Sequence, residues 1–165
     1  MQNTTSQILA GLANETNRST LSPILTALAD RLSSQATATA GLLVSVTTTR
    51  AKTGATPFYG IAQGTPVTIA AGVDMPVLTG LNISANAFNI IAFYIDRASV
   101  VTALLGLEGT TLAKAVFPQT PQGKALVGYL IVTHSAAFVG GTTPLSTATT
   151  VYVSPVGAID PTVLI

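Results

Sequence analysis

The stretch GKALVGYLIVTHSAAFVGGTTPL, residues 123–145, contains the longest strand pattern of the chain and its only histidine, His134. Within residues 124–134, apolar side chains occupy both alternating sets of positions, which is typical of a strand that contacts water on neither face. We expect these two faces to hold Leu126, Leu130 and Val132 on one side, and Ala125, Val127, Tyr129 and Ile131 on the other. One face can pack in a core. The second needs cover from the N-terminal helices or a neighbouring subunit, so Val127, Tyr129 and Ile131 are candidate interface residues.

Similar patterns with a period of two recur along the chain from residue 42 onward. They are rich in Val, Ile, Thr and Tyr and are separated by Gly, Pro, Asn and Asp, which predicts short strands joined by turns. The predicted strands are residues 42–50, 66–72, 76–83, 88–96, 99–106, 124–134 and 147–155, and residues 108–123 are predicted to be a surface loop. This spacing predicts a mainly β fold, an antiparallel β-sandwich or a jelly-roll-like barrel.

The first forty residues have a helical pattern instead. Leu21, Leu25, Leu28 and Leu32 recur at spacings of four, three and four, which places them on one face of a helix. Ser22 followed by Pro23 predicts a helix start, so we expect a helix from about residue 23 to 34. A weaker helix is expected before it, with a polar turn at residues 14–20.

We therefore predict two parts, a helical N-terminal arm over residues 1–40 and a β-sandwich domain over residues 41–165. A leucine stripe of two turns is too short to form an isolated coiled coil. It must pack on the β-domain, on copies of itself or on a larger scaffold. We expect deletion of residues 1–40 to leave a soluble β-rich product.

Composition favours a protein that buries surface against a partner. Charged residues make up 8% of the 165-residue chain, hydrophobic residues 48%, and the net charge is +1; an ordinary soluble domain has about 25% charged residues. The mean hydropathy is +0.57. A monomer with a surface of Thr, Ser, Asn and Gln is the alternative. The charge predicts no nucleic-acid binding, and no apolar run approaches the roughly 20 residues of a membrane span. We also expect no conventional signal peptide.

Few residues have side chains suited to catalysis or metal binding. The chain has one His, no Cys and six acidic residues, so a zinc site, a disulfide or a serine-histidine-aspartate triad has little support. Asp74 and Asp96 are expected to form turns. His134 is expected to end a strand rather than to transfer a proton. We expect no enzymatic activity, no cofactor and no metal.

The order of features across residues 64–154 resembles a family of tailed-bacteriophage virion proteins. In that family a strand is followed by the pattern P-x-G-K-x-x-x-G-x-x-x-V and then by F-x-x-G-T-T-x-L. The matching positions here are Pro121, Gly123, Lys124, Gly128 and Val132, followed by Phe138, Gly141, Thr142, Thr143 and Leu145. The resemblance implies a structural role in the virion and no catalytic residues.

The leading candidate is a capsid decoration or cement protein on the exterior of the phage head, in contact with the major capsid protein. A tail-fibre or baseplate component, or a receptor- or carbohydrate-binding module, is the alternative. The low charge and the doubly apolar strands also predict a homotrimer, with an interface formed by these strands and the leucine stripe.

Overall fold

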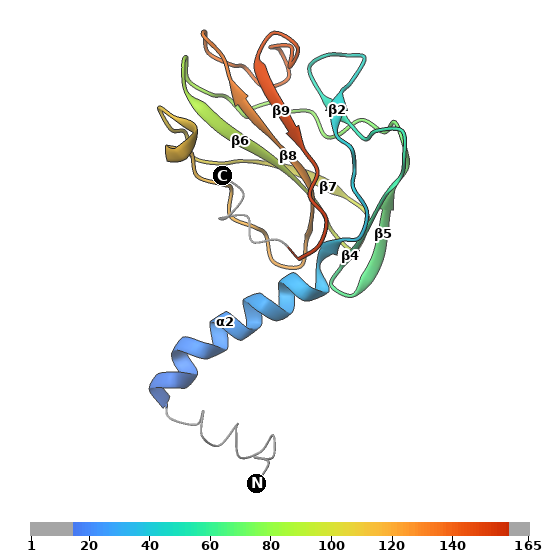
Figure 1. Ribbon diagram of the computed structural model, residues 1–165, viewed down its shortest axis with the longest axis vertical. Helices are drawn as coiled ribbons and strands as arrows, with labels where there is room; N and C mark the ends of the chain where they lie inside the picture. The colour runs from blue at the N-terminus through green and yellow to red at the C-terminus, as the bar shows by residue number, and fades with distance from the viewer. Residues whose placement is uncertain (1–14, 159–165) are drawn as a thin grey trace.

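The computed structural model describes residues 15–158 and is mainly β, with three antiparallel sheets and one helix that extends away from them (Figure 1). The elements in chain order are α2 (Glu15–Ser33), β1 (Gln35–Ala36), β2 (Leu43–Val44), β3 (Ala51–Lys52), β4 (Phe58–Ala62), β5 (Thr65–Ile69), β6 (Phe88–Ile95), β7 (Val101–Leu105), the 3-10 helix η1 (Leu112–Lys114), β8 (Ala125–Thr133) and β9 (Thr149–Val153). The prediction of a mainly β protein with a helical arm is confirmed. None of the three sheets closes into a barrel over residues 15–158.

The largest sheet has four strands in the order β7-β6-β8-β9, and its two central strands are apolar on both faces. Along β6, side chains alternate between two separate cores. Ile91, Phe93 and Ile95 enter the larger core, and Ile90, Ala92 and Tyr94 enter the smaller one on the other face. The larger core also receives Phe58 and Val67 from the sheet β1-β4-β5.

A β-bulge changes the alternation of β8. Phe93 pairs with Gly128 and Tyr94 pairs with Leu126, so Val127 is an extra residue in the ladder. The face assignment predicted for residues 124–134 is therefore wrong. Val127 and Ala125 lie in the larger core together with Leu130 and Val132, whereas Leu126, Tyr129 and Ile131 contribute to the smaller core.

The connection between β7 and β8 covers the second face of this sheet. Leu107 and Val116 pair across it, Ala115 and Phe117 are buried, and the Phe117 ring meets the Tyr129 ring edge-on at a centroid distance of 5.1 Å. A Cβ at Gly106 would collide with the Val116 carbonyl oxygen, so the crossing chains approach as closely as glycine permits. The prediction of a surface loop over residues 108–123 is wrong, because this segment carries part of the core.

Two further strand predictions are wrong, and one strand of the smaller sheets was not predicted. Residues 42–50 do not form one strand but the start of the hairpin β2–β3, which turns near Thr48 at a φ of 59°. Residues 76–83 form no strand apart from an isolated bridge between Ile83 and Phe138. Strand β4 was not predicted; it joins β5 through the two-residue loop Gln63-Gly64, in which both residues have positive φ, the type I′ geometry that matches strand twist.

Helix α2 runs without interruption from Glu15 to Ser33 and includes Pro23. The predicted helix start at Ser22-Pro23 and the predicted turn at residues 14–20 are therefore wrong. The supposed turn contains neither Gly nor Pro, so nothing in it stops a helix. The weaker helix expected near the N-terminus lies outside the described residues. Residues 35–40, assigned to the arm by sequence, pack with the sheets: β1 pairs with β4, and Ala36 and Ala40 lie in the larger core.

Candidate interaction surface

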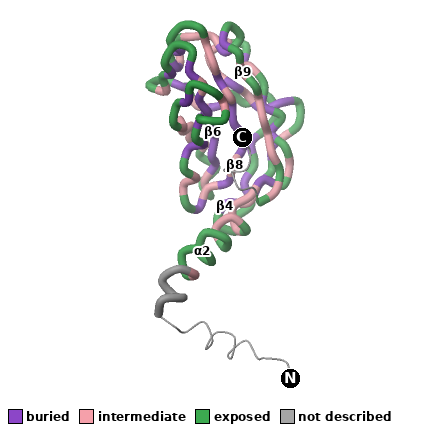
Figure 2. The backbone as a smooth tube through the Cα atoms, turned by 60° about the vertical axis from the view of Figure 1, so that its left-hand side comes forward, coloured by how far each residue is buried: buried purple, intermediate pink, exposed green. Residues whose placement is uncertain are grey.

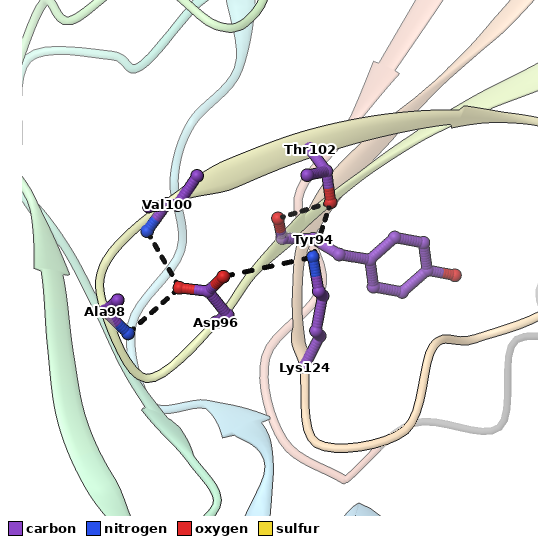
Figure 3. Close-up of polar contacts among 6 residues, drawn as sticks. All are labelled: Tyr94, Asp96, Ala98, Val100, Thr102 and Lys124. Carbon is purple, nitrogen blue, oxygen red and sulfur yellow. Dashed lines mark hydrogen bonds and ion pairs between the residues drawn. The ribbon is translucent and has the colours of Figure 1, made fainter.

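A connected group of polar side chains lies at the turn between β6 and β7 (Figure 3). Asp96 Oδ1 accepts hydrogen bonds from the backbone N–H groups of Ala98 at 2.9 Å and Val100 at 3.0 Å. Lys124 Nζ lies 4.0 Å from Asp96 Oδ2 and donates to Thr102 Oγ1 at 3.1 Å. These contacts tie the turn to the start of β8, and the prediction that Asp96 forms a turn is confirmed.

His134 follows directly after the last residue of β8, where the sequence predicted the strand to end. Its Nδ1 lies 3.1 Å from the carbonyl oxygen of Ala136, two residues further along the chain. This contact belongs to the loop that His134 begins. The role of His134 as a structural residue stays a prediction.

The described residues contain neither a metal-binding cluster nor a membrane-spanning helix. Over residues 15–158, no three His, Cys, Asp or Glu side chains gather as they would around a metal ion. In the same range no helix has the length and apolar character of a membrane span. A small cavity of about 30 Å³ lies between the end of α2 and the strand β8, lined among others by Asp30, Thr120 and Lys124. It has room for little more than a water molecule.

The leucine stripe of α2 is an exposed apolar feature of the described residues. The exposed fractions are 56% for Leu25, 51% for Leu28 and 57% for Leu32, and Leu21 is partly buried. Ile24, exposed at 57%, lies beside them and was not included in the predicted set. In Figure 2 the described part of α2 is mostly exposed, whereas the interior of the β-sheets is buried. Burying the exposed half of each side chain would stabilise an assembly by about 1 kcal/mol per residue.

The base of α2 is fixed to the β-sheets by polar contacts. Both carboxylate oxygens of Asp30 accept a hydrogen bond from the Gly123 N–H, at 3.0 and 3.1 Å. The Gly64 N–H donates to the Ser33 carbonyl at 2.9 Å, and the Gln63 N–H donates to Ser34 Oγ at 3.0 Å. Strand β1 then begins at residue 35. The helix therefore leaves the β-sheets in a defined direction.

The leucine stripe faces away from the described part of the β-domain. Pro23, Ala27 and Asp30 line a groove between α2 and residues 117–122. With 3.6 residues per turn, these three lie roughly opposite the centre of the stripe on the helix circumference. The β-domain of the same chain therefore does not cover the leucines, and the interpretation of α2 as a helix that packs on its own sheet is wrong.

The candidate interface residues from β8 are separated by the structure. Val127 is fully buried in the larger core and contacts no solvent, Tyr129 is buried beneath Phe117, and Ile131 is partly exposed at the edge of the smaller core. The prediction that these three share one open face is wrong because the bulge at Val127 reverses the alternation. Of the predicted interface set, the leucines of α2 remain accessible.

The chain matches no protein-family model, and neither a curated protein nor a solved structure shows significant similarity to it.

Proposed function

We propose that this chain is a non-enzymatic structural protein of a tailed-phage virion, and specifically a capsid decoration or cement protein that binds the exterior of the head. The observation that carries the proposal is the exposed leucine stripe on a helix whose base is hydrogen-bonded to a β-domain with its own buried core. Such a chain acts by burying surface. Many copies on a shell would stabilise the assembled state by mass action, with no reaction at all.

The residues of the virion-protein pattern support the proposal because each has an architectural role. Gly123 has a φ of 75° and its N–H holds Asp30, and a Cβ at Gly128 would meet the Leu42 side chain and the Val153 carbonyl oxygen, each at 2.6 Å. Phe138 and Leu145 are 1% exposed. A pattern made of such residues encodes a fold and not a catalytic site.

We propose further that the two larger sheets form a β-sandwich, since the sheets β1-β4-β5 and β7-β6-β8-β9 both supply the larger core. The working form is a homotrimer, whose partner is the major capsid protein or another virion protein. The net charge of +1 gives no support for nucleic acid as a partner.

A carbohydrate-binding module has less support. Such sites usually present exposed aromatic side chains with polar partners. Of the five Phe and four Tyr of the chain, Tyr59 is the one exposed by more than half, at 52%. A location on the tail fibre or baseplate is a separate alternative, which a map of the particle distinguishes.

The test is to locate the chain on intact particles. Virions purified from the culture in which the sequence occurs would be labelled with gold-conjugated antibodies against the purified protein and imaged by electron microscopy. Label distributed over the head supports the proposal. Label confined to the tail or baseplate would replace decoration with a fibre or baseplate role, and absence of the chain from the virion would refute both.

A further inference from the structure

We propose that copies of this chain associate through their α2 helices, in a parallel bundle with the leucine stripes inside and the β-domains outside. This inference rests on the homotrimer in the proposed function and names the surface that forms it. In the trimer, the leucine stripe of each α2 thus contacts the α2 helices of the two other copies.

The spacing of the stripe fits such a bundle. In a heptad written abcdefg, Leu25 and Leu32 take position a, and Leu21 and Leu28 take position d, the two positions that face a partner helix. Ile24 takes position g beside them. The apolar face is therefore wider than the narrow seam of a and d alone.

The attachment of α2 to its own β-domain leaves this inner face free. Pro23 and Asp30 take position f, and Thr26 and Ala27 take positions b and c, the outer positions of a bundle. All four line the groove against residues 117–122 of the same chain. The β-domain thus occupies the side of the helix that a bundle turns outward, so association does not require the β-domain to move.

The charge distribution along α2 is compatible with self-association over the leucine stripe. Between residues 21 and 33 the charged residues are Asp30 and Arg31, and both line the small cavity at the base of the helix. Earlier in α2, Arg18 lies one heptad before Leu25 and also takes position a. The stripe itself carries no charge. Identical stripes therefore meet without like-charge repulsion over residues 21–32, whereas a parallel bundle brings the Arg18 positions of its copies together one heptad earlier.

The expected direction is parallel. A trimer with closed rotational symmetry relates its subunits by rotation about one axis, so all three helices point the same way along it. Position 28 of one helix then lies beside position 28 of the next. In an antiparallel pair, Leu28 would instead lie beside Leu25 of the partner.

The natural absence of cysteine makes disulfide cross-linking a direct test. Leu28→Cys would be placed in the full chain, and the purified protein oxidised under mild conditions and run on a non-reducing gel. Ala27→Cys is the control for the opposite face of the helix. Leu107→Cys, at a side chain 67% exposed on the β-domain, is the control for random collision. Disulfides require Cα atoms within about 7 Å.

We expect Leu28→Cys to form linked pairs at least about tenfold faster than either control. Cross-linking only in a mixture of Leu25→Cys and Leu28→Cys chains would overturn the parallel arrangement. Equal, slow cross-linking in all variants would overturn the bundle and indicate that another surface, such as residues 1–14 or a capsid protein, occupies the stripe. Because the test uses purified protein and the labelling experiment uses virions, each proposal can fail without the other.

Discussion

The outer face of the β6–β8 sheet and the leucine face of α2 look alike in sequence but differ in the structure. Both are apolar, and both were expected to need a partner. The sheet face is covered by Ala115 and Phe117 of its own chain, whereas Leu25, Leu28 and Leu32 stay half exposed. An apolar face shows that cover is needed, but only the packed chain shows whether that cover is already present.

The difference has a plain physical origin. The connection between β7 and β8 is long enough to cross the sheet and carries one large aromatic side chain, Phe117, which fills the space above Tyr129. Helix α2 is joined to β1 through a single residue, Ser34, and is held by Asp30 on its opposite side. Its leucines cannot turn toward the sheets without breaking that contact. The case for self-association therefore moves from the strands to the helix.

The largest expected effect concerns where the arm ends. Deletion of residues 1–33 should leave a folded β-domain, since residues 21–33, the part of α2 whose burial is described, contribute nothing to either core. Deletion of residues 1–40, which the sequence pattern alone led us to expect would leave a soluble β-rich product, should instead prevent folding, because it also removes β1, Ala36 and Ala40 from the larger core. Circular dichroism and heat-induced unfolding of both products would decide this. A cooperative, β-rich product from the longer deletion would contradict the assignment of residues 35–40 to the β-domain.

The cover of the sheet is tested by Phe117→Ala, which should lower the free energy of unfolding by about 3 kcal/mol or more, the usual range for a buried Phe. Val116→Ala is the matched control, since its side chain is 51% exposed, and should change stability by less than about 1 kcal/mol. Urea unfolding measures both. Equal effects from the two substitutions would show that Phe117 does not seal this face.

The buried and partly buried tyrosines predict a pH dependence of stability. Burial raises the pKa of Tyr94, against a smaller opposing effect of its hydrogen bond with Thr120, and burial also raises the pKa values of Tyr129 and Tyr152. Folding favours the neutral phenols, so this stabilisation is complete below about pH 10, the ordinary tyrosine pKa, and is lost as pH rises further. Urea unfolding from pH 8 to 11 should show the decline. Tyr94→Phe should make it shallower, and an unchanged slope would contradict a buried, neutral Tyr94.

The smallest expected effect is at His134. Because its side chain contacts the Ala136 carbonyl in a partly exposed loop, His134→Ala should change stability by no more than about 1 kcal/mol and leave assembly and particle binding intact. Stability, assembly and particle binding can all be measured on one preparation of the variant. Loss of binding in a folded variant would restore His134 as a functional residue.

Much of the β part could be predicted from residue patterns. Strands β6, β7, β8 and β9 were found because alternating Val, Ile and Tyr lie between clear turn residues. The bulge at Val127 left no signal, since apolar residues fill both faces there and a shift by one residue preserves the pattern. Strand β4 did have a signal in the sequence, the Gln63-Gly64 pair between two short apolar runs. This hairpin signal was not recognised.

The candidate surface was predicted in part. The stripe of four leucines was visible from its spacing. Ile24 at its border was missed because it takes position g, next to the inner positions a and d that define the stripe. The contact between Asp30 and Gly123 joins residues 93 apart in sequence, and no local pattern predicts it. This contact decides which face of the helix stays open.

The most direct test of the account is the mass of the full chain in solution, measured by light scattering after gel filtration at micromolar concentration. We expect about 50 kDa, three copies of the 16.7 kDa chain. Leu25→Gln combined with Leu28→Gln keeps helix propensity and should reduce the mass to that of one chain, whereas the control Leu107→Gln should remain at 50 kDa. A full chain that elutes as a stable monomer, or a double variant that keeps the assembled mass, would contradict the claim that the leucine stripe of α2 joins copies of this protein.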